Sequence, residues 1–293
     1  MTSMSRLSRS VSRLQSQTSN RWRRSTKWIH DRRRHRLAIP PPTRLETQVH
    51  KNGVFEIRLA GGDRRNVLGR TTIDHLEALV AGPPDGTRVI VITAAPPDFC
   101  AGYDLVEAAH GDAEALVANE GNFEALRQST IPIVAALQGN VIGGGLELAL
   151  SADVRVASPE TRLALPASKL GLVYSEAGIR LVVAMVGESV ARALFLAGRD
   201  LDADTALAMG LVTDIVGREQ LRGRALAVAD QIASWSTVAT SGNRQILDVV
   251  AGRTSVNTVE LRLASFAPDS DLRHSIAHFV ARRARTLRRS GPK

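Results

Sequence analysis

Cysteine is almost absent from this 293-residue chain, which contains only Cys100. A single thiol cannot form an internal disulfide or a cysteine-rich zinc framework, so a reducing compartment is favoured and the cytoplasm is the expected location. No apolar run reaches the ~20 residues that a membrane-spanning helix needs, and we expect no membrane partner. Hydrophobic residues nevertheless make up 44% of the chain, enough to bury a full core.

Lysine is also scarce, and the basic charge is unevenly placed. Residues 1–42 contain eleven Arg or Lys and the single acid Asp31, so this segment has a net charge of +10. The total net charge is +9, so the remaining chain has a net charge of −1. This Ser/Arg-rich segment ends in Pro40-Pro41-Pro42 and is predicted to be a disordered basic extension. Residues 1–36 resemble a mitochondrial transit peptide, which leaves the mitochondrial matrix as an alternative location. A basic arm could also bind nucleic acid or anionic lipid, but we favour a passive extension and predict no nucleic-acid partner.

Apolar periodicity predicts the elements of the remaining chain. Strands are expected at 49–60, 88–93, 131–137 and 153–157, with a turn at 61–63 and a helix at 71–80. The β-branched run at 88–93 is typical of a strand covered on both faces. Further helices are expected at 190–198, 204–210, 220–235, 237–250 and 272–289. Strands that alternate with helices predict an α/β fold.

Two glycine-containing loops follow predicted strands. One is the loop 98–105 around Gly102, and the other is the run Gly143-Gly144-Gly145, which precedes a helix extending to about residue 151. Glycine lets a ligand approach the main chain, and the start of a helix offers free N–H groups. One N–H from each loop would form an oxyanion hole, in which each donor is worth roughly 3–4 kcal/mol. The same glycines would also allow a helix to pack closely on a strand, and the loops alone do not distinguish these interpretations.

The usual competing motifs are missing. The glycines around residue 143 do not form the G-x-G-x-x-G dinucleotide fingerprint, and Gly145 precedes Leu146 rather than the Lys of a P-loop. No G-x-S-x-G nucleophile elbow occurs. Phosphate binding at these loops and serine hydrolysis therefore lose their usual support.

Several motifs resemble those of the enoyl-CoA hydratase/isomerase (crotonase) superfamily. Phe99-Cys-Ala-Gly-Tyr-Asp-Leu105 resembles its F-x-A-G-x-D-[LI] loop, and the segment from Gly139 to Ala149 resembles its G-x-x-x-G-G-G-x-E-L-A. Other matches occur in the family's order: Arg65-Asn66-Val67-Leu68, Asp153-Val-Arg-Val-Ala157, Leu170-Gly171, Leu196-Ala-Gly-Arg199, Gly210-Leu-Val212, and Asp271 with 279–283. The resemblance covers residues 49–283, about four-fifths of the chain.

This resemblance implies a crotonase-like ββα spiral, or superhelix, at 43–235 and a helical trimerisation region at 236–293. It implies a homotrimer or a dimer of trimers. The substrate would be an acyl-CoA thioester, with no further cofactor and no metal. His274 and His278 lie one helical turn apart but have no third ligand candidate nearby in the sequence.

By motif position, the resemblance assigns the two oxyanion donors to the backbone amides of Tyr103 and Gly144. Glu147 corresponds to the family's first catalytic glutamate, although an acid in the first turn would also stabilise its own helix. Basic residues of the last helix, Arg282 and Arg283, would either bind CoA or face solvent. The remaining residues expected to contact the CoA thioester are Arg65, Val67, Ala101, Gly102, Asp104 and Gly143.

The chain departs from the family at its second catalytic glutamate, whose place is taken by Ala167. Alanine cannot transfer a proton, so Glu176 or Tyr174, a few residues further on, is considered as a replacement; both residue types are also ordinary in a loop. Enoyl-CoA hydratase remains the leading function. The alternatives are an acyl-CoA decarboxylase, an enoyl-CoA isomerase and a non-catalytic acyl-CoA-binding member.

Overall fold

The computed structural model describes residues 42–110 and 123–289. The predicted basic extension therefore lies almost entirely outside the described residues. A six-stranded sheet forms the centre; its first two strands are antiparallel to each other, and the other neighbouring strands are parallel. Its order is β1 (Arg44–Val49), β2 (Val54–Ala60), β3 (Val89–Ala94), β4 (Ile133–Leu137), β6 (Val154–Ala157) and β9 (Asp214–Ile215). A smaller sheet contains β5 (Asn140–Ile142), β7 (Arg162–Ala164) and β8 (Leu201–Asp202).

The prediction of one strand over 49–60 is wrong in its first part. The chain reverses at Asn52 and Gly53, whose φ values are +61° and +75°, and Val49 then pairs with Phe55. Asn-Gly is the usual sequence for a tight hairpin turn because both residues tolerate positive φ. The segment therefore forms the last residue of β1, a turn and the whole of β2.

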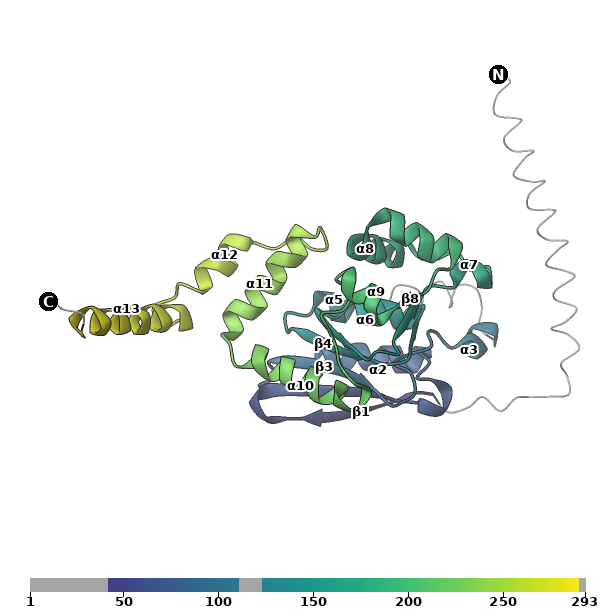
Figure 1. Ribbon diagram of the computed structural model, residues 1–293, viewed down its shortest axis with the longest axis horizontal. Helices are drawn as coiled ribbons and strands as arrows, with labels where there is room; N and C mark the ends of the chain where they lie inside the picture. Colours follow the sequence, from purple (N-terminus) through teal and green to yellow (C-terminus); the bar gives the residue numbers. More distant parts are fainter. Residues whose placement is uncertain (1–41, 111–122, 290–293) are drawn as a thin grey trace, which may run out of the picture. The chain divides into compact units, whose positions relative to one another are not determined.

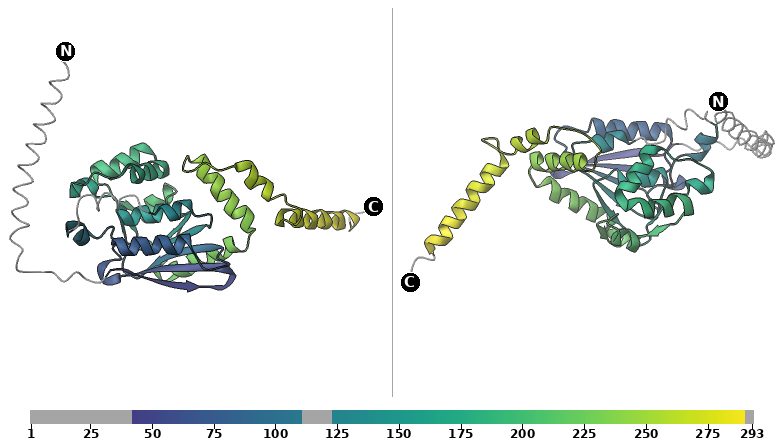
Figure 2. Two further views of the ribbon diagram at one scale, coloured as in Figure 1. Left: turned by 180° about the vertical axis from the view of Figure 1, so that it is seen from behind. Right: turned by 90° about the horizontal axis from the view of Figure 1, so that it is seen from above.

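The central strand β3 is covered on both faces, as its β-branched run predicts. Ile90 and Ile92 belong to the larger apolar cluster, which includes residues of α2 (Arg70–Ala81). Val89 and Val91 belong to a second cluster with residues of α10 (Arg218–Ala233). Figures 1 and 2 show α2 and α10 on opposite faces of this sheet. The expected α/β class is confirmed.

Most predicted helices are present within about two residues of their expected ends. The exception is α8 (Glu176–Ala197), of which only the last third was expected; Gly187 interrupts its helical geometry at φ +76°. The remaining helices of this part of the chain are α3 (Leu105–His110), α5 (Glu124–Gln128), α6 (Gly144–Leu150), α7 (Ala167–Leu170) and α9 (Ala203–Ala208). The short 3-10 turns η1 (Lys51–Gly53) and η2 (Gly62–Arg64) lie beside β2.

The C-terminal region is helical, as expected. It consists of α11 (Thr237–Val250), α12 (Thr258–Ala264) and α13 (Asp271–Arg289). The side chains of Arg282 and Arg283 lie outside the described residues. Across 42–110 and 123–289, we find no helix with the length and apolarity required to cross a bilayer.

Candidate active site

The two glycine-containing loops run side by side. Cys100 and Val141 form an isolated parallel bridge, with hydrogen bonds from Cys100 N to Asn140 O (3.1 Å) and from Ile142 N to Cys100 O (2.9 Å). A Cβ atom added to Gly102 would lie 2.9 Å from Ile142 O and 3.7 Å from the Gly144 nitrogen. The backbone at Gly102 therefore lies directly against the start of α6.

The glycines serve close packing as well as exposure of the backbone. At Gly145, an added Cβ would lie 2.6 Å from Cys100 O and 2.9 Å from Cys100 Sγ, so this residue allows α6 to lie on the neighbouring loop. Gly143 has φ +55° and ψ −119° and turns the chain into the helix. Among the described residues the Gly144 N–H has no acceptor, while Glu147 N donates to Gly143 O at 3.1 Å. Gly144 thus presents a donor beside the first loop.

The backbone around Tyr103 is held on its other side by Leu68. Leu68 and Tyr103 form a parallel bridge, with hydrogen bonds from Leu68 N to Gly102 O (2.8 Å) and from Asp104 N to Leu68 O (2.9 Å). Ala101 N also donates to Arg65 O at 2.9 Å. This local pairing fixes the peptide units next to Gly144.

Glu147 lies on α6, in the first turn, and is only 1% exposed. The hydroxyl of Tyr103 lies 3.5 Å from Glu147 Oε2. The Tyr103 ring covers Gly144, since an added Cβ there would lie 2.7 Å from Cε2 and Cζ of the ring. Three of the predicted catalytic residues, Tyr103, Gly144 and Glu147, are therefore together.

Two buried side chains that the sequence analysis did not assign support these loops. Asn66 is fully buried; it accepts a hydrogen bond from Gly61 N (2.8 Å) and donates to Ala95 O (2.7 Å) and Asp98 O (2.8 Å). Asp98 Oδ1 accepts hydrogen bonds from N (2.7 Å) and Nδ2 (2.9 Å) of Asn140. Asp98 therefore connects the first loop to the segment that leads into the second. Its position directly before the Phe99 motif is the sequence feature that could have indicated this role.

The predicted CoA-contacting residues have different surroundings. Arg65 is 60% exposed, with Nη1 3.4 Å from Asp98 Oδ2. Val67 is half-buried, and its carbonyl accepts the Thr43 hydroxyl at 2.6 Å. The exposed guanidinium of Arg65 is thus available to an anionic ligand, and its role in CoA binding stays a prediction.

Asp104 has a structural role in the described residues. Its carboxylate pairs with Arg64 at 2.5 Å and accepts hydrogen bonds from Val106 N (2.9 Å) and Glu107 N (3.3 Å) at the start of α3. Burial alone would raise the pKa of Asp104, but the hydrogen bonds from Arg64 and the two amides outweigh it and lower the pKa below its ordinary value. A direct contact of Asp104 with CoA also stays a prediction.

The structure does not bring Glu176 together with Glu147. The Glu176 side chain is 83% exposed and pairs with Arg180 one helical turn further on, at 2.5 Å. It lines a cavity of about 620 Å³ between α8 and the segment after α11. The Tyr174 ring packs against Phe195, with ring centroids 5.1 Å apart. Neither residue is placed by a described contact beside the carboxylate of Glu147.

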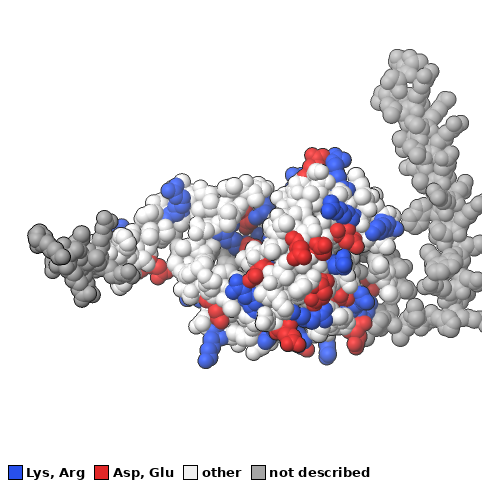
Figure 3. Space-filling view, viewed as in Figure 1, with Lys and Arg blue, Asp and Glu red and all other residues white. Residues whose placement is uncertain are grey.

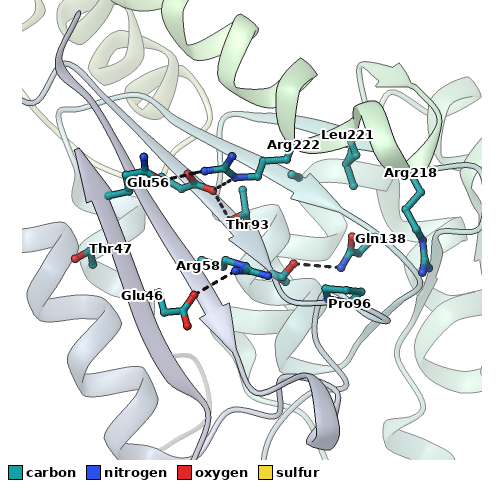
Figure 4. A pocket seen from close by; sticks show the side chains of 13 residues that line it. Glu46, Thr47, Glu56, Arg58, Thr93, Pro96, Gln138, Arg218, Leu221 and Arg222 are labelled. Atoms are coloured by element: carbon teal, nitrogen blue, oxygen red, sulfur yellow. Dashed lines mark hydrogen bonds and ion pairs between the residues drawn. The ribbon is translucent and has the colours of Figure 1, made fainter. Parts of the chain in front are cut away.

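A separate polar cavity of about 460 Å³ lies on the α10 side of the large sheet (Figure 4). The buried carboxylate of Glu56 accepts hydrogen bonds from Arg222 Nη2 (2.5 Å), His50 Nε2 (2.8 Å) and Thr93 Oγ1 (2.8 Å). Burial alone would raise the pKa of Glu56, but Arg222, His50 and Thr93 together lower it. Because no residue of the two loops lines this cavity, we interpret its network as a link between α10 and β2.

Charged side chains and possible metal ligands occur throughout the described residues. On the face shown in Figure 3, basic and acidic side chains are interspersed over the described body. In the part of the chain that the structure describes, no three His, Cys, Asp or Glu side chains gather as a metal site. The loops around Gly102 and Gly144 thus remain the candidate site.

The family assignment follows from comparison with known proteins. The family model described as "Enoyl-CoA hydratase/isomerase" matches residues 49–286. The chain belongs to this family, and the predicted crotonase-like architecture is confirmed by structural neighbours. Enoyl-CoA hydratase subunit I from Geobacillus kaustophilus has a TM-score of 0.74 and 25% identity, with 81% of this chain and 95% of that chain covered. DspI of Pseudomonas aeruginosa has a TM-score of 0.74 and 29% identity, with 84% and 98% covered.

Relatives in sequence carry names of related activities. A Mycobacterium leprae protein named "Probable enoyl-CoA hydratase echA12" is 36% identical over 195 residues, which cover 62% of this chain. The match spans 63% of that relative's length, less than two thirds. Carnitinyl-CoA dehydratase of Proteus mirabilis is 34% identical over 201 residues, covering 67% of this chain and 77% of the relative.

Proposed function

We propose that this protein is an enoyl-CoA hydratase, which adds water reversibly across the double bond of a 2-enoyl-CoA. The observation that carries the proposal is the contact between the Gly102 loop and the start of α6, with buried Glu147 one turn into that helix. Membership of the enoyl-CoA hydratase/isomerase family supports the same reaction.

In this proposal the thioester oxygen binds between the backbone amides of Tyr103 and Gly144. Attack of water at C3 moves the double-bond electrons onto that oxygen, and preorganised donors stabilise the resulting enolate. The Gly144 amide suits this role because it has no acceptor among the described residues. Glu147 removes a proton from the attacking water, a contribution of roughly 10²- to 10⁴-fold for general base catalysis.

The experiment follows the conjugated thioester absorbance of crotonyl-CoA and longer enoyl-CoAs. The wild-type protein should hydrate at least one of them. Glu147→Gln should lower kcat strongly with little change in acyl-CoA affinity, because the amide keeps the shape but cannot accept the proton. Binding of acyl-CoA without any turnover would refute the hydratase proposal.

A decarboxylase is the second candidate, and Ala167 is the observation that favours it. This residue is buried at the start of α7, where the family motif has its second glutamate. Decarboxylation needs an oxyanion hole and a proton source but no activated water. Release of CO₂ from a malonyl-type CoA thioester, with no hydration of enoyl-CoAs, would favour this reaction.

We further propose that the protein assembles as a homotrimer or a dimer of trimers in the cytoplasm. Large apolar side chains are exposed on all three C-terminal helices, among them Val250 (80%), Leu263 (63%) and Phe279 (63%). Exposed apolar surface of this kind is typical of an interface between subunits. Light scattering should give a mass near three or six times 31.5 kDa, and a monomer would contradict the proposal.

A further inference from the structure

The hydroxyl of Tyr103 is a second proton-carrying group beside Glu147. The two side chains come from different loops, and Tyr103 Oη lies 3.5 Å from Glu147 Oε2. Glu147 is nearly inaccessible to solvent, whereas Tyr103 is partly exposed. The separation of the two oxygen atoms is slightly longer than the reach of about 2.6–3.2 Å for direct proton transfer, and such distances commonly shorten when a substrate binds.

The position of the phenol is fixed by its backbone and by Gly144. The bridge to Leu68 holds the main chain of Tyr103, and the ring occupies the space above the Gly144 Cα. A side chain at position 144 would displace that ring, because its Cβ would lie 2.7 Å from two ring carbons. The bare backbone of Gly144 therefore accommodates the Tyr103 ring as well as exposing an amide.

We propose that the Tyr103 phenol is the second proton-transfer group of this site and supplies the proton that the family takes from a glutamate at the position of Ala167. The inference rests on the proposed hydratase function. Water oxygen bonds to C3 while Glu147 takes one water proton and the double-bond electrons move to the thioester oxygen. The enolate then collapses and C2 takes the proton of the Tyr103 hydroxyl. The proton now on Glu147 passes to the phenolate, so one water is consumed and both side chains are restored.

The other candidates for the second group have described contacts with residues other than Glu147. The carboxylate of Glu176 is exposed and paired with Arg180. Asp104, adjacent to Tyr103 in the sequence, pairs with Arg64 and caps α3. Tyr174 packs on Phe195. The described contacts thus favour Tyr103.

The test compares Tyr103→Phe with Tyr174→Phe, the same substitution at the only other tyrosine of the chain. Phenylalanine keeps the ring over Gly144 and removes only the hydroxyl. We expect Tyr103→Phe to lower kcat for crotonyl-CoA hydration by roughly 10²- to 10⁴-fold, with acyl-CoA affinity within about threefold of wild type. Tyr174→Phe should stay near wild type.

A second assay separates this inference from the proposed function. Butyryl-CoA has no double bond to hydrate, but its C2 hydrogen exchanges with D₂O if Tyr103, after passing its proton to Glu147, removes the hydrogen from C2. NMR should show exchange in the wild type and in Tyr174→Phe, and loss of exchange in Tyr103→Phe.

The outcomes are distinguishable. Exchange that depends on Tyr103, without hydration of enoyl-CoAs, would refute the hydratase and retain the role of Tyr103 at C2. Hydration and exchange that persist in Tyr103→Phe would overturn the inference alone. Loss of activity in Tyr174→Phe instead would assign the role to Tyr174, and absence of both reactions in the wild type would overturn both proposals.

Discussion

Gly102 is the residue at which the two candidate oxyanion loops meet, so Gly102→Ala tests their geometry most directly. Its φ is +98°, a conformation that alanine rarely adopts, and the new Cβ would lie 2.9 Å from Ile142 O. That oxygen belongs to β5, a strand paired with β7, and has little freedom to move. Alanine must therefore strain its own backbone or push the loop away from α6.

The two effects can be assigned magnitudes. A left-handed backbone costs a non-glycine residue about 1–2 kcal/mol. Overpacking in a close contact adds ~1–3 kcal/mol. Displacement of the Tyr103 amide should also weaken the proposed oxyanion donor at that residue. Complete loss of one such donor lowers kcat by about 10²- to 10³-fold. We expect a destabilisation of roughly 2–5 kcal/mol together with this fall in kcat.

Gly210→Ala is the matched control, because Gly210 has φ +73° and nothing within 4 Å of an added Cβ. It should lose only about 1–2 kcal/mol and keep wild-type kcat. Urea unfolding and crotonyl-CoA hydration, measured on the three proteins, separate strain from displacement. A Gly102→Ala protein with wild-type turnover would refute the assignment of this loop as an oxyanion donor.

Three further predictions concern buried groups around the sheet. Because the folded state lowers the pKa of Glu56, its stabilisation is present above the ordinary value of 4.5 and is lost as pH falls through the folded value. The urea concentration at the unfolding midpoint should therefore decrease as the pH is lowered below 4.5, and it should decrease less in Glu56→Gln. Parallel plots of midpoint against pH for the two proteins would contradict this. Burial raises the pKa of Cys100 to about 12, so a thiol reagent should label the native protein at pH 8 far more slowly than the unfolded protein, and equal rates would contradict it. Asn66→Ala should cost about 2–4 kcal/mol in urea unfolding by removing three hydrogen bonds of a buried side chain, and a loss under ~0.5 kcal/mol would contradict that role.

The sequence predicted best the elements that carry strong apolar patterns. β3, β4 and β6 agree with the expected β-branched runs to within two residues at each end, because a strand buried on both faces needs continuous apolar side chains. Strands of two or three residues, such as β8 and β9, are too short to show a period. Asn52-Gly53 is a common tight-turn sequence, and the prediction of one strand over 49–60 missed the reversal there.

The site was predictable in its backbone and less so in its side chains. Motif position indicated the loops around Gly102 and Gly144 and the acid Glu147, because glycine spacing reflects what the main chain must do. The proximity of the Tyr103 hydroxyl to Glu147 depends on pairing with Leu68 and on side-chain direction, which one sequence does not encode locally. Glu176 was misjudged for a different reason: it begins α8, whose first part the sequence analysis did not expect, and it pairs with Arg180 one turn further on at an exposed helix face.

The connections made by Asn66 have a consequence for how the site forms during folding. Asn66 links the turn after β2 to the segment after β3, and Asp98 links that segment to the start of β5. These contacts join segments far apart in the chain. Long-range pairing of parallel strands is slow because the entropy of loop closure is lost before the new contacts stabilise the structure. Acyl-CoA binding should therefore appear late in refolding, after the helical signal, which makes it a specific readout of completed native structure.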